Sequence, residues 1–192
     1  VTVTPVGERI VEQAQRVLEE TSRIREIAQA GRNQLTGALK LGLIFTVAPY
    51  LLPDLIPALH VRAPQMPLDI EENLTETLEA GLKSGRLDAV IVALPFAPPG
   101  VVAEFLYEEP FQVVVPSSHK WAKRKSVQPG ELAGENTILL SVGHCFRDQV
   151  LESCPELNRA DAHVPRTNSL ETVRNMVASG LGISVLPRDA LT

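Results

Sequence analysis

Strand-like and helix-like patterns alternate between residues 35 and 94. Leu39, Leu41 and Leu43 fall on alternate positions, which indicates a strand. The run RLDAVIVAL, residues 86–94, is apolar at almost every position, which is typical of a strand buried on both faces of a parallel sheet. The expected order is a strand in 35–44, a helix in 51–59, a strand in 68–74, a helix in 75–85 and a strand in 86–94. This order predicts an α/β fold.

A second series of strands and helices is expected after residue 110. The predicted strands lie in 111–116, 136–143 and 181–187. A helix is expected to start at Ser169, because Asn168 and Glu171 stand three residues apart like the two partners of a capping box. The basic run from Lys120 to Lys125 is interpreted as the solvated face of a helix. The second half therefore also reads as α/β.

The first thirty residues carry the pattern of one long helix. Pro5 stands near its start and Gly31 just past its end. Ile10, Val17 and Ile24 are seven residues apart, as in the seam of a coiled coil. The positions between them are small or polar and make the seam weak: Ala14, Thr21 and Ala28. We expect this helix to pair with a second copy of the chain, helped by other contacts, and the alternative is a helix that packs on its own domain.

Charge and hydropathy exclude several classes of protein. The net charge of -5 and the pI near 5.4 argue against a broad basic surface for a phosphate backbone, so this chain by itself is not expected to bind DNA strongly. We find no secretion signal and no apolar run long enough to cross a bilayer. The chain is therefore expected to be cytoplasmic, without membrane contact.

The two cysteines of the chain lie close together, in the stretch GHCFRDQVLESC at 143–154. Because cytoplasmic thiols are kept reduced, the pair is either incidental, a metal site or a thiol switch. Cys145 is expected to begin a helix. A thiol at a helix N-terminus, beside His144 and two residues before Arg147, has surroundings that favour the reactive thiolate. Cys145 is thus the better nucleophile, and Cys154 is the candidate resolving thiol.

The spacing of the two cysteines limits how they can react with each other. In a continuous helix, nine residues at roughly 1.5 Å each place the two Cα atoms about 13.5 Å apart on opposite faces. A disulfide requires Cα atoms within roughly 7 Å. If the segment is helical when reduced, the bond can form only after the helix unwinds, which makes the segment a two-state element controlled by oxidation.

Other chemistry has less support. Two buried cysteines that act as small apolar residues are common in intracellular proteins. A zinc site lacks a closely spaced pair to hold the metal, although four candidate ligands exist: His144, Cys145, Cys154 and His163. A hydrolase would require a separate histidine base, and no nucleophile elbow, P-loop or dinucleotide motif occurs. We expect no enzyme activity, cofactor or metal.

Two threonines indicate where a small ligand could bind. Thr46 follows the first predicted strand and Thr75 follows the second, each ahead of a helix. Both hydroxyls are therefore expected at the carboxyl edge of the sheet, where α/β proteins bind ligands. Each threonine taken alone could equally be a helix cap or a turn residue. Because Cys145 also lies between a strand and a helix, a shared pocket is consistent with the pattern.

These stretches resemble the effector-binding region of LysR-type transcriptional regulators over nearly the whole chain. The resemblance rests on the long first helix, on LPDLIPALHVRAPQMPLDIEE and LKSGRLDAVIVAL, and on VASGLGISVLP. Within the family, GHCFRDQVLESC is similar to the motif H-C-x-R-D-Q with a second cysteine nine positions after the first. That motif marks the members that sense hydrogen peroxide.

The resemblance implies a role for each candidate residue. Peroxide would oxidise Cys145 to a sulfenic acid, which would condense with Cys154 to a disulfide that cellular dithiols reduce again. Residues that correspond to Thr46, Thr75 and His144 line the peroxide pocket of such proteins. Two further motif residues, Arg147 and Asp148, would stabilise the thiolate and the reduced fold.

The resemblance also implies the domain organisation. The family fold has two Rossmann-like α/β subdomains, similar to periplasmic binding proteins. We expect a linker helix that mediates dimer contacts at 1–32, subdomain I at 33–109 and subdomain II at 110–192. DNA recognition would require an N-terminal winged helix-turn-helix outside this sequence, and subdomain II would be incomplete after Pro187. Self-association as a dimer or tetramer is expected.

Two other functions stay open from the sequence. A LysR-type regulator that answers a small metabolite would bind its ligand between the subdomains without either cysteine. A thiol peroxidase would use the same two cysteines for many turnovers with a reductant. The coiled-coil pattern of the first helix favours a regulator over a peroxidase.

Overall fold

The computed structural model describes residues 3–30, 35, 37–159 and 166–191. It forms two compact units, each made of several segments. Unit 1 consists of Val1–Ile44, Leu51–Val92 and Pro98–Val101. Unit 2 consists of Phe45–Tyr50, Ala93–Ala97 and Val102–Thr192. The short segment Phe45–Tyr50 thus belongs with the second half of the chain although it follows the first strand.

The first element is the predicted long helix, α1 (Pro5–Ala30). The three residues of the proposed seam that are seven apart are all exposed in the single chain: Ile10 at 63%, Val17 at 58% and Ile24 at 67%. The helix itself is confirmed, while its pairing with a second copy stays a prediction.

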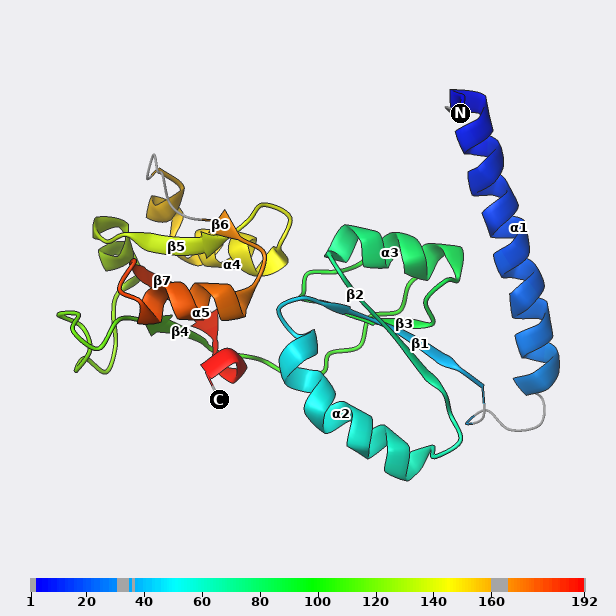
Figure 1. Cartoon of the computed structure of the whole chain (residues 1–192), viewed down its shortest axis with the longest axis horizontal. Coiled ribbons are helices and arrows are strands. Elements are labelled where there is room, and N and C mark those ends of the chain that lie inside the picture. The colour runs from blue at the N-terminus through cyan, green and yellow to red at the C-terminus, as the bar shows by residue number, and fades with distance from the viewer. Residues whose placement is uncertain (1–2, 31–34, 36, 160–165, 192) are drawn as a thin grey trace. The chain divides into compact units, whose positions relative to one another are not determined.

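Unit 1 contains a parallel sheet of three strands in the order β2-β1-β3. Figure 1 shows α2 and α3 on opposite sides of this sheet. The bounds are β1 (Leu39–Ile44), α2 (Ala48–Arg62), β2 (Leu68–Asn73), α3 (Thr75–Ser84) and β3 (Ala89–Ile91). The predicted order of strand, helix, strand, helix, strand is therefore confirmed.

The central strand β1 is buried because it has a neighbour on each side. Its last four residues, Leu41 to Ile44, are all buried. Gly42 lies where a Cβ atom would come within 2.7 Å of the Leu78 side chain and 2.8 Å of the Leu87 side chain. Glycine at this position therefore allows α3 to pack closely on the sheet.

The apolar run 86–94 does not form the expected strand buried on both faces. It contributes only β3, whose three residues pair with β1 alone. Ala89 is exposed, and Val90 and Ile91 are half-buried. The prediction was wrong in length and burial, because an edge strand has only one neighbour to cover it.

Unit 2 contains a mixed sheet of four strands in the order β4-β7-β5-β6. β4 runs antiparallel to β7, while β5 runs parallel to both β7 and β6. The strands are β4 (Phe111–Val114), β5 (Thr137–Leu140), β6 (Arg166–Thr167) and β7 (Ile183–Pro187). The helices are α4 (Cys145–Ser153) and α5 (Leu170–Ala178), with 3₁₀ turns η1 (Pro129–Gly134), η2 (Pro155–Arg159) and η3 (Arg188–Leu191). The α/β class is confirmed.

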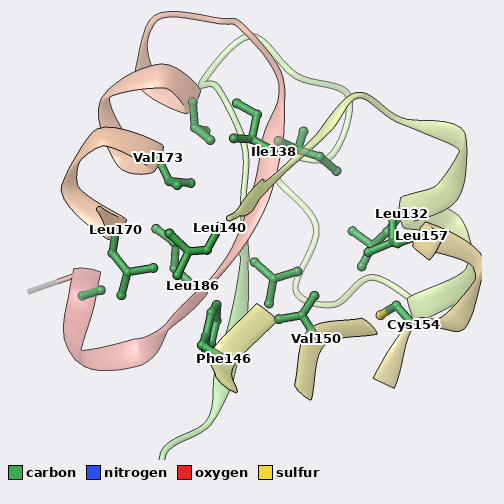
Figure 2. Packing of buried hydrophobic residues seen from close by; sticks show 14 of the residues in the cluster. Leu132, Ile138, Leu140, Phe146, Val150, Cys154, Leu157, Leu170, Val173 and Leu186 are labelled. Carbon is green, nitrogen blue, oxygen red and sulfur yellow. The ribbon is translucent and has the colours of Figure 1, made fainter. Parts of the chain in front are cut away.

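The core of unit 2 joins both helices to the sheet, as Figure 2 shows. Ile138 of β5 and Leu186 of β7 are completely buried at its centre. Phe146 and Val150 enter the core from α4, and Leu170 and Val173 enter it from α5. The single tryptophan, Trp121, belongs to the same cluster.

Two local predictions in unit 2 were wrong. The helix α5 is capped by Ser169, whose hydroxyl accepts the backbone N–H of Thr172 at 3.3 Å, so Asn168 is not the capping residue. The basic run 120–125 forms successive turns and not a helix. Those turns bury Trp121 beneath two of the basic side chains, Lys120 and Arg124.

Candidate functional site

Cys145 is the first residue of α4, immediately after the turn that follows β5. The turn passes through Gly143 at φ 100°, a backbone conformation that favours glycine. The carbonyl of His144 accepts the Arg147 N–H at 3.0 Å, which closes the first turn of the helix. The Cys145 side chain is half-buried. The Cys145 sulfur is thus partly accessible and lies at the start of a helix, where the sequence placed it.

Three polar residues follow Cys145 closely in α4, and two of them hold the helix to other segments. Arg147 Nη1 donates to the carbonyl of Leu140, the last residue of β5, at 3.2 Å. Asp148 is exposed in the first turn, where its charge is favourable to the helix dipole. Gln149 Nε2 donates to the carbonyl of Leu94 at 3.0 Å. The reduced helix is thus bound to the strand before it and to a distant segment of unit 2.

His144 is buried, with 5% of its surface exposed. Its ring lies against the ring of Phe45, with 5.8 Å between centroids and 57° between planes. Thr46 follows Phe45 directly and is also 5% exposed. Thr46 is thus the chain neighbour of the residue that lies against the His144 ring, and all three residues belong to unit 2.

Thr75 lies in unit 1. It is the first residue of α3 and therefore does not occupy the N-cap position of that helix. The residue in the capping position is Leu74. Among the described residues, the buried Thr75 Oγ1 has no hydrogen-bond partner. The adjacent parallel strands β1 and β2 end at the paired residues Ile44 and Asn73. Thr46 comes two residues after the first of these ends, and Thr75 comes two residues after the second. A buried hydroxyl without a hydrogen-bond partner is costly in a folded protein.

Cys154 closes the far end of α4 in a different environment. Its N–H donates to the Val150 carbonyl at 2.9 Å, and its side chain is 5% exposed. Figure 2 shows Phe146, Val150 and Cys154 along one side of the unit 2 core. Both cysteines are free thiols at opposite ends of one continuous helix. The predicted helical spacing, about 13.5 Å between the two Cα atoms, therefore applies.

Burial, and secondly the charge of Glu156, raise the pKa of the Cys154 thiol above its ordinary value of 9.0. The folded protein then keeps this proton at a pH where the unfolded chain loses it. The stability that this contributes is fully present below about pH 9 and is lost as the pH rises through the folded pKa. We therefore expect the unfolding free energy of the wild type, relative to that of Cys154→Ala, to fall between pH 7 and pH 10. Urea unfolding under reducing conditions measures both free energies. If the two free energies changed equally with pH, the raised pKa of Cys154 would be contradicted.

No group of three or more histidine, cysteine, aspartate or glutamate side chains is placed to hold a metal ion in the described part of the chain. One of the four candidate zinc ligands, His163, lies outside the described residues. No helix within that part has the length and apolar character required to cross a membrane.

Several residues at the site were not foreseen from the sequence. Phe45 packs on His144 across 99 positions of the chain, and Gln149 reaches Leu94 across 55. Tyr50 donates its hydroxyl to Glu171 across 121 positions. Single long-range contacts of this kind leave no periodic signal, although Phe45 and Tyr50 do flank the predicted Thr46.

Comparisons with known proteins identify the family of the chain. Residues 32–192 match the family model of the LysR substrate binding domain. The DNA-binding transcriptional dual regulator OxyR of Escherichia coli is 41% identical over 187 residues, which cover 97% of this chain and 61% of that protein. This chain therefore spans about three-fifths of the length of that relative.

Solved structures of OxyR proteins share the fold. A reduced form of OxyR from Neisseria meningitidis is 54% identical, with a TM-score of 0.77 over 81% of this chain and 74% of that one. A Corynebacterium glutamicum OxyR mutant with bound hydrogen peroxide is 33% identical, with a TM-score of 0.77 over 96% of this chain and 58% of that one. The expected periplasmic-binding-protein-like fold is thus confirmed. The chain belongs to the LysR substrate-binding domain family and, within it, to the OxyR regulatory domains.

Proposed function

We propose that this chain is the regulatory region of a transcriptional regulator that senses hydrogen peroxide. The observation that carries the proposal is the placement of the two free thiols on α4. Cys145 is half-buried at the helix N-terminus, and Cys154 is buried in the core at the other end. One thiol is reachable by a small oxidant while the other is withheld until the helix opens.

The proposed reaction has two steps. The Cys145 thiolate attacks one oxygen of peroxide, the O–O bond breaks, and the second oxygen leaves and is protonated to water. The sulfur is oxidised to a sulfenic acid. Cys154 then attacks that sulfur, and the sulfenic oxygen departs as a second water while the disulfide forms. A cellular dithiol returns both residues to thiols.

The second step requires α4 to change. The two Cα atoms must approach from about 13.5 Å to within roughly 7 Å, so the helix must unwind and Cys154 must leave the core. This would release the Arg147 and Gln149 hydrogen bonds that hold the reduced helix. Oxidation thereby selects a second arrangement of residues 143–155.

The proposal also gives a role to the residues around Cys145. We infer that Thr46, Thr75 and His144 bind the peroxide, while Arg147 and Asp148 stabilise the thiolate and the reduced helix. The burial of Thr46 and His144, and the unpartnered Thr75 hydroxyl, support the assignment. Hydroxyl and imidazole groups can both donate to and accept from a peroxide molecule.

The remaining parts of the proposal concern the whole regulator. We assign 1–32 to a linker helix, 33–109 to subdomain I and 110–192 to subdomain II. The exposed apolar seam of α1 supports pairing between copies. DNA would be bound by a separate winged helix-turn-helix domain, and the regulator would act in the cytoplasm as a sensor and not as a peroxidase.

Fluorescence of Trp121 tests the proposed structural change. This only tryptophan is 7% exposed and shares a core cluster with Cys154. One equivalent of hydrogen peroxide is expected to change its emission in the reduced wild type, because disulfide formation withdraws Cys154 from that cluster. Dithiothreitol should reverse the change, and Cys154→Ser should not show it. Unchanged emission in a protein whose two thiols have both been oxidised would contradict the proposed remodelling.

A further inference from the structure

The segment Phe45–Tyr50 is attached to the rest of unit 2 at both of its ends. Phe45, at one end, lies against the buried His144 ring. Tyr50, at the other end, donates its hydroxyl to Glu171 Oε1 of α5 at 3.3 Å. Thr46 is buried between these two attachments. We propose that Tyr50 is a positioning residue for the peroxide reaction, which holds Thr46 in place beside the Cys145 site through its hydrogen bond to Glu171.

This inference rests on the proposed function and adds to it a residue distant from the sulfur. Tyr50 packs against the unit 2 core, so its ring is fixed by apolar contact as well as by the hydroxyl. Its backbone N–H donates to the Val47 carbonyl at 3.1 Å, which closes the turn directly after Thr46. A shift of Tyr50 would therefore be passed to Thr46 through only a few backbone bonds.

The acceptor is itself held in place. Glu171 lies in the first turn of α5, where its charge is favourable to the helix dipole. Its second oxygen, Oε2, pairs with Arg174 Nη2 at 2.6 Å. Each carboxylate oxygen thus has a partner, which directs Oε1 toward Tyr50.

Tyr50 keeps its proton over the physiological range. Burial, followed by the charge of Glu171, raises the pKa of Tyr50 to about 12. The Tyr50 hydroxyl therefore stays the donor of its hydrogen bond to Glu171 near neutral pH.

The experiment compares the rate of Cys145 oxidation by hydrogen peroxide with the rate of its alkylation by iodoacetamide. Tyr50→Phe removes only the hydroxyl, and is expected to slow oxidation by about threefold to tenfold, the effect of one hydrogen bond. Alkylation should be unchanged, because iodoacetamide does not require Thr46. Tyr107→Phe makes the same chemical change at the only other tyrosine and should leave both rates unchanged.

A double-mutant cycle shows whether Tyr50 acts through Thr46. In a Thr46→Val background, Tyr50→Phe should cause no further loss of oxidation rate. Glu171→Gln retains an acceptor oxygen and should keep most of the rate, whereas Glu171→Leu should match Tyr50→Phe.

Three results would overturn the inference. These are an unchanged oxidation rate in Tyr50→Phe, an equal loss of oxidation and alkylation, and additive losses in the double mutant. In each case a wild type that reacts rapidly with peroxide leaves the proposed function standing. A wild type that reacts with peroxide no faster than an ordinary thiol removes both.

Discussion

Replacing Cys145 with serine is expected to abolish the reaction with hydrogen peroxide. A serine hydroxyl is not oxidised by peroxide, and the remaining thiol, Cys154, is only 5% exposed and has a raised pKa, so little thiolate is available. Peroxide consumption at stoichiometric concentration, followed by titration of the remaining thiol, measures the loss.

Cys154→Ser is the matched control for this prediction. It removes the second thiol but leaves Cys145 at the start of α4. Oxidation should then proceed at the wild-type rate and stop at a sulfenic acid, which a dimedone label detects. If Cys145→Ser consumed peroxide as fast as wild type, the assignment of the reactive residue would be wrong.

Phe146→Ala is expected to cause the largest loss of stability near the site. Phe146 is 6% exposed and packs edge-on against Phe111, with 4.8 Å between ring centroids and 70° between planes. Truncating a buried phenylalanine costs about 3–5 kcal/mol of unfolding free energy, from lost burial and the cavity that remains. Urea unfolding followed by Trp121 emission measures the change within unit 2.

Phe105→Ala provides the matched control, because Phe105 is 63% exposed in the same unit. Its effect on the free energy of unfolding should stay within about 0.5 kcal/mol. Equal losses in the two variants would show that Phe146 does not anchor α4 to the core in the way the structure indicates.

The helix α4 and the places of its two thiols could be predicted because their determinants are local. The segment 143–154 contains a glycine for the turn, a thiol at the helix start and a second thiol nine residues later. A helix of nine residues joins them in the structure. The same locality explains why the long helix α1 was predicted with its correct limits from Pro5 and Gly31.

Predictions failed where the local sequence allowed two structures and tertiary packing determined which one formed. Asn168 and Ser169 can both cap a helix, and Ser169 does so in the structure while Leu170 and Val173 enter the core. The run 86–94 is apolar enough for a central strand, but its position at the edge of the sheet limits β3 to three residues. Neither outcome is encoded by composition or periodicity alone.

In the candidate site, too, local signals could be read from the sequence and long-range contacts could not. Cys145, His144 and Cys154 were identified from one short stretch, and Thr46 and Thr75 from the rule that ligands bind at the carboxyl edge of a parallel sheet. Their roles stay predictions. Attachments such as the Tyr50 hydroxyl on Glu171 depend on how distant segments meet, so they could be found only in three dimensions.

Peptide mapping by mass spectrometry tests the central claim most directly. The fully reduced wild type would be exposed briefly to one equivalent of hydrogen peroxide in the presence of excess glutathione, then quenched by alkylation. The proposed function predicts a peptide in which Cys145 is linked to Cys154, formed while the glutathione stays largely reduced. Alkylated Cys145 and Cys154 together with oxidised glutathione would contradict it, because the protein thiol would then be no more reactive than an ordinary one.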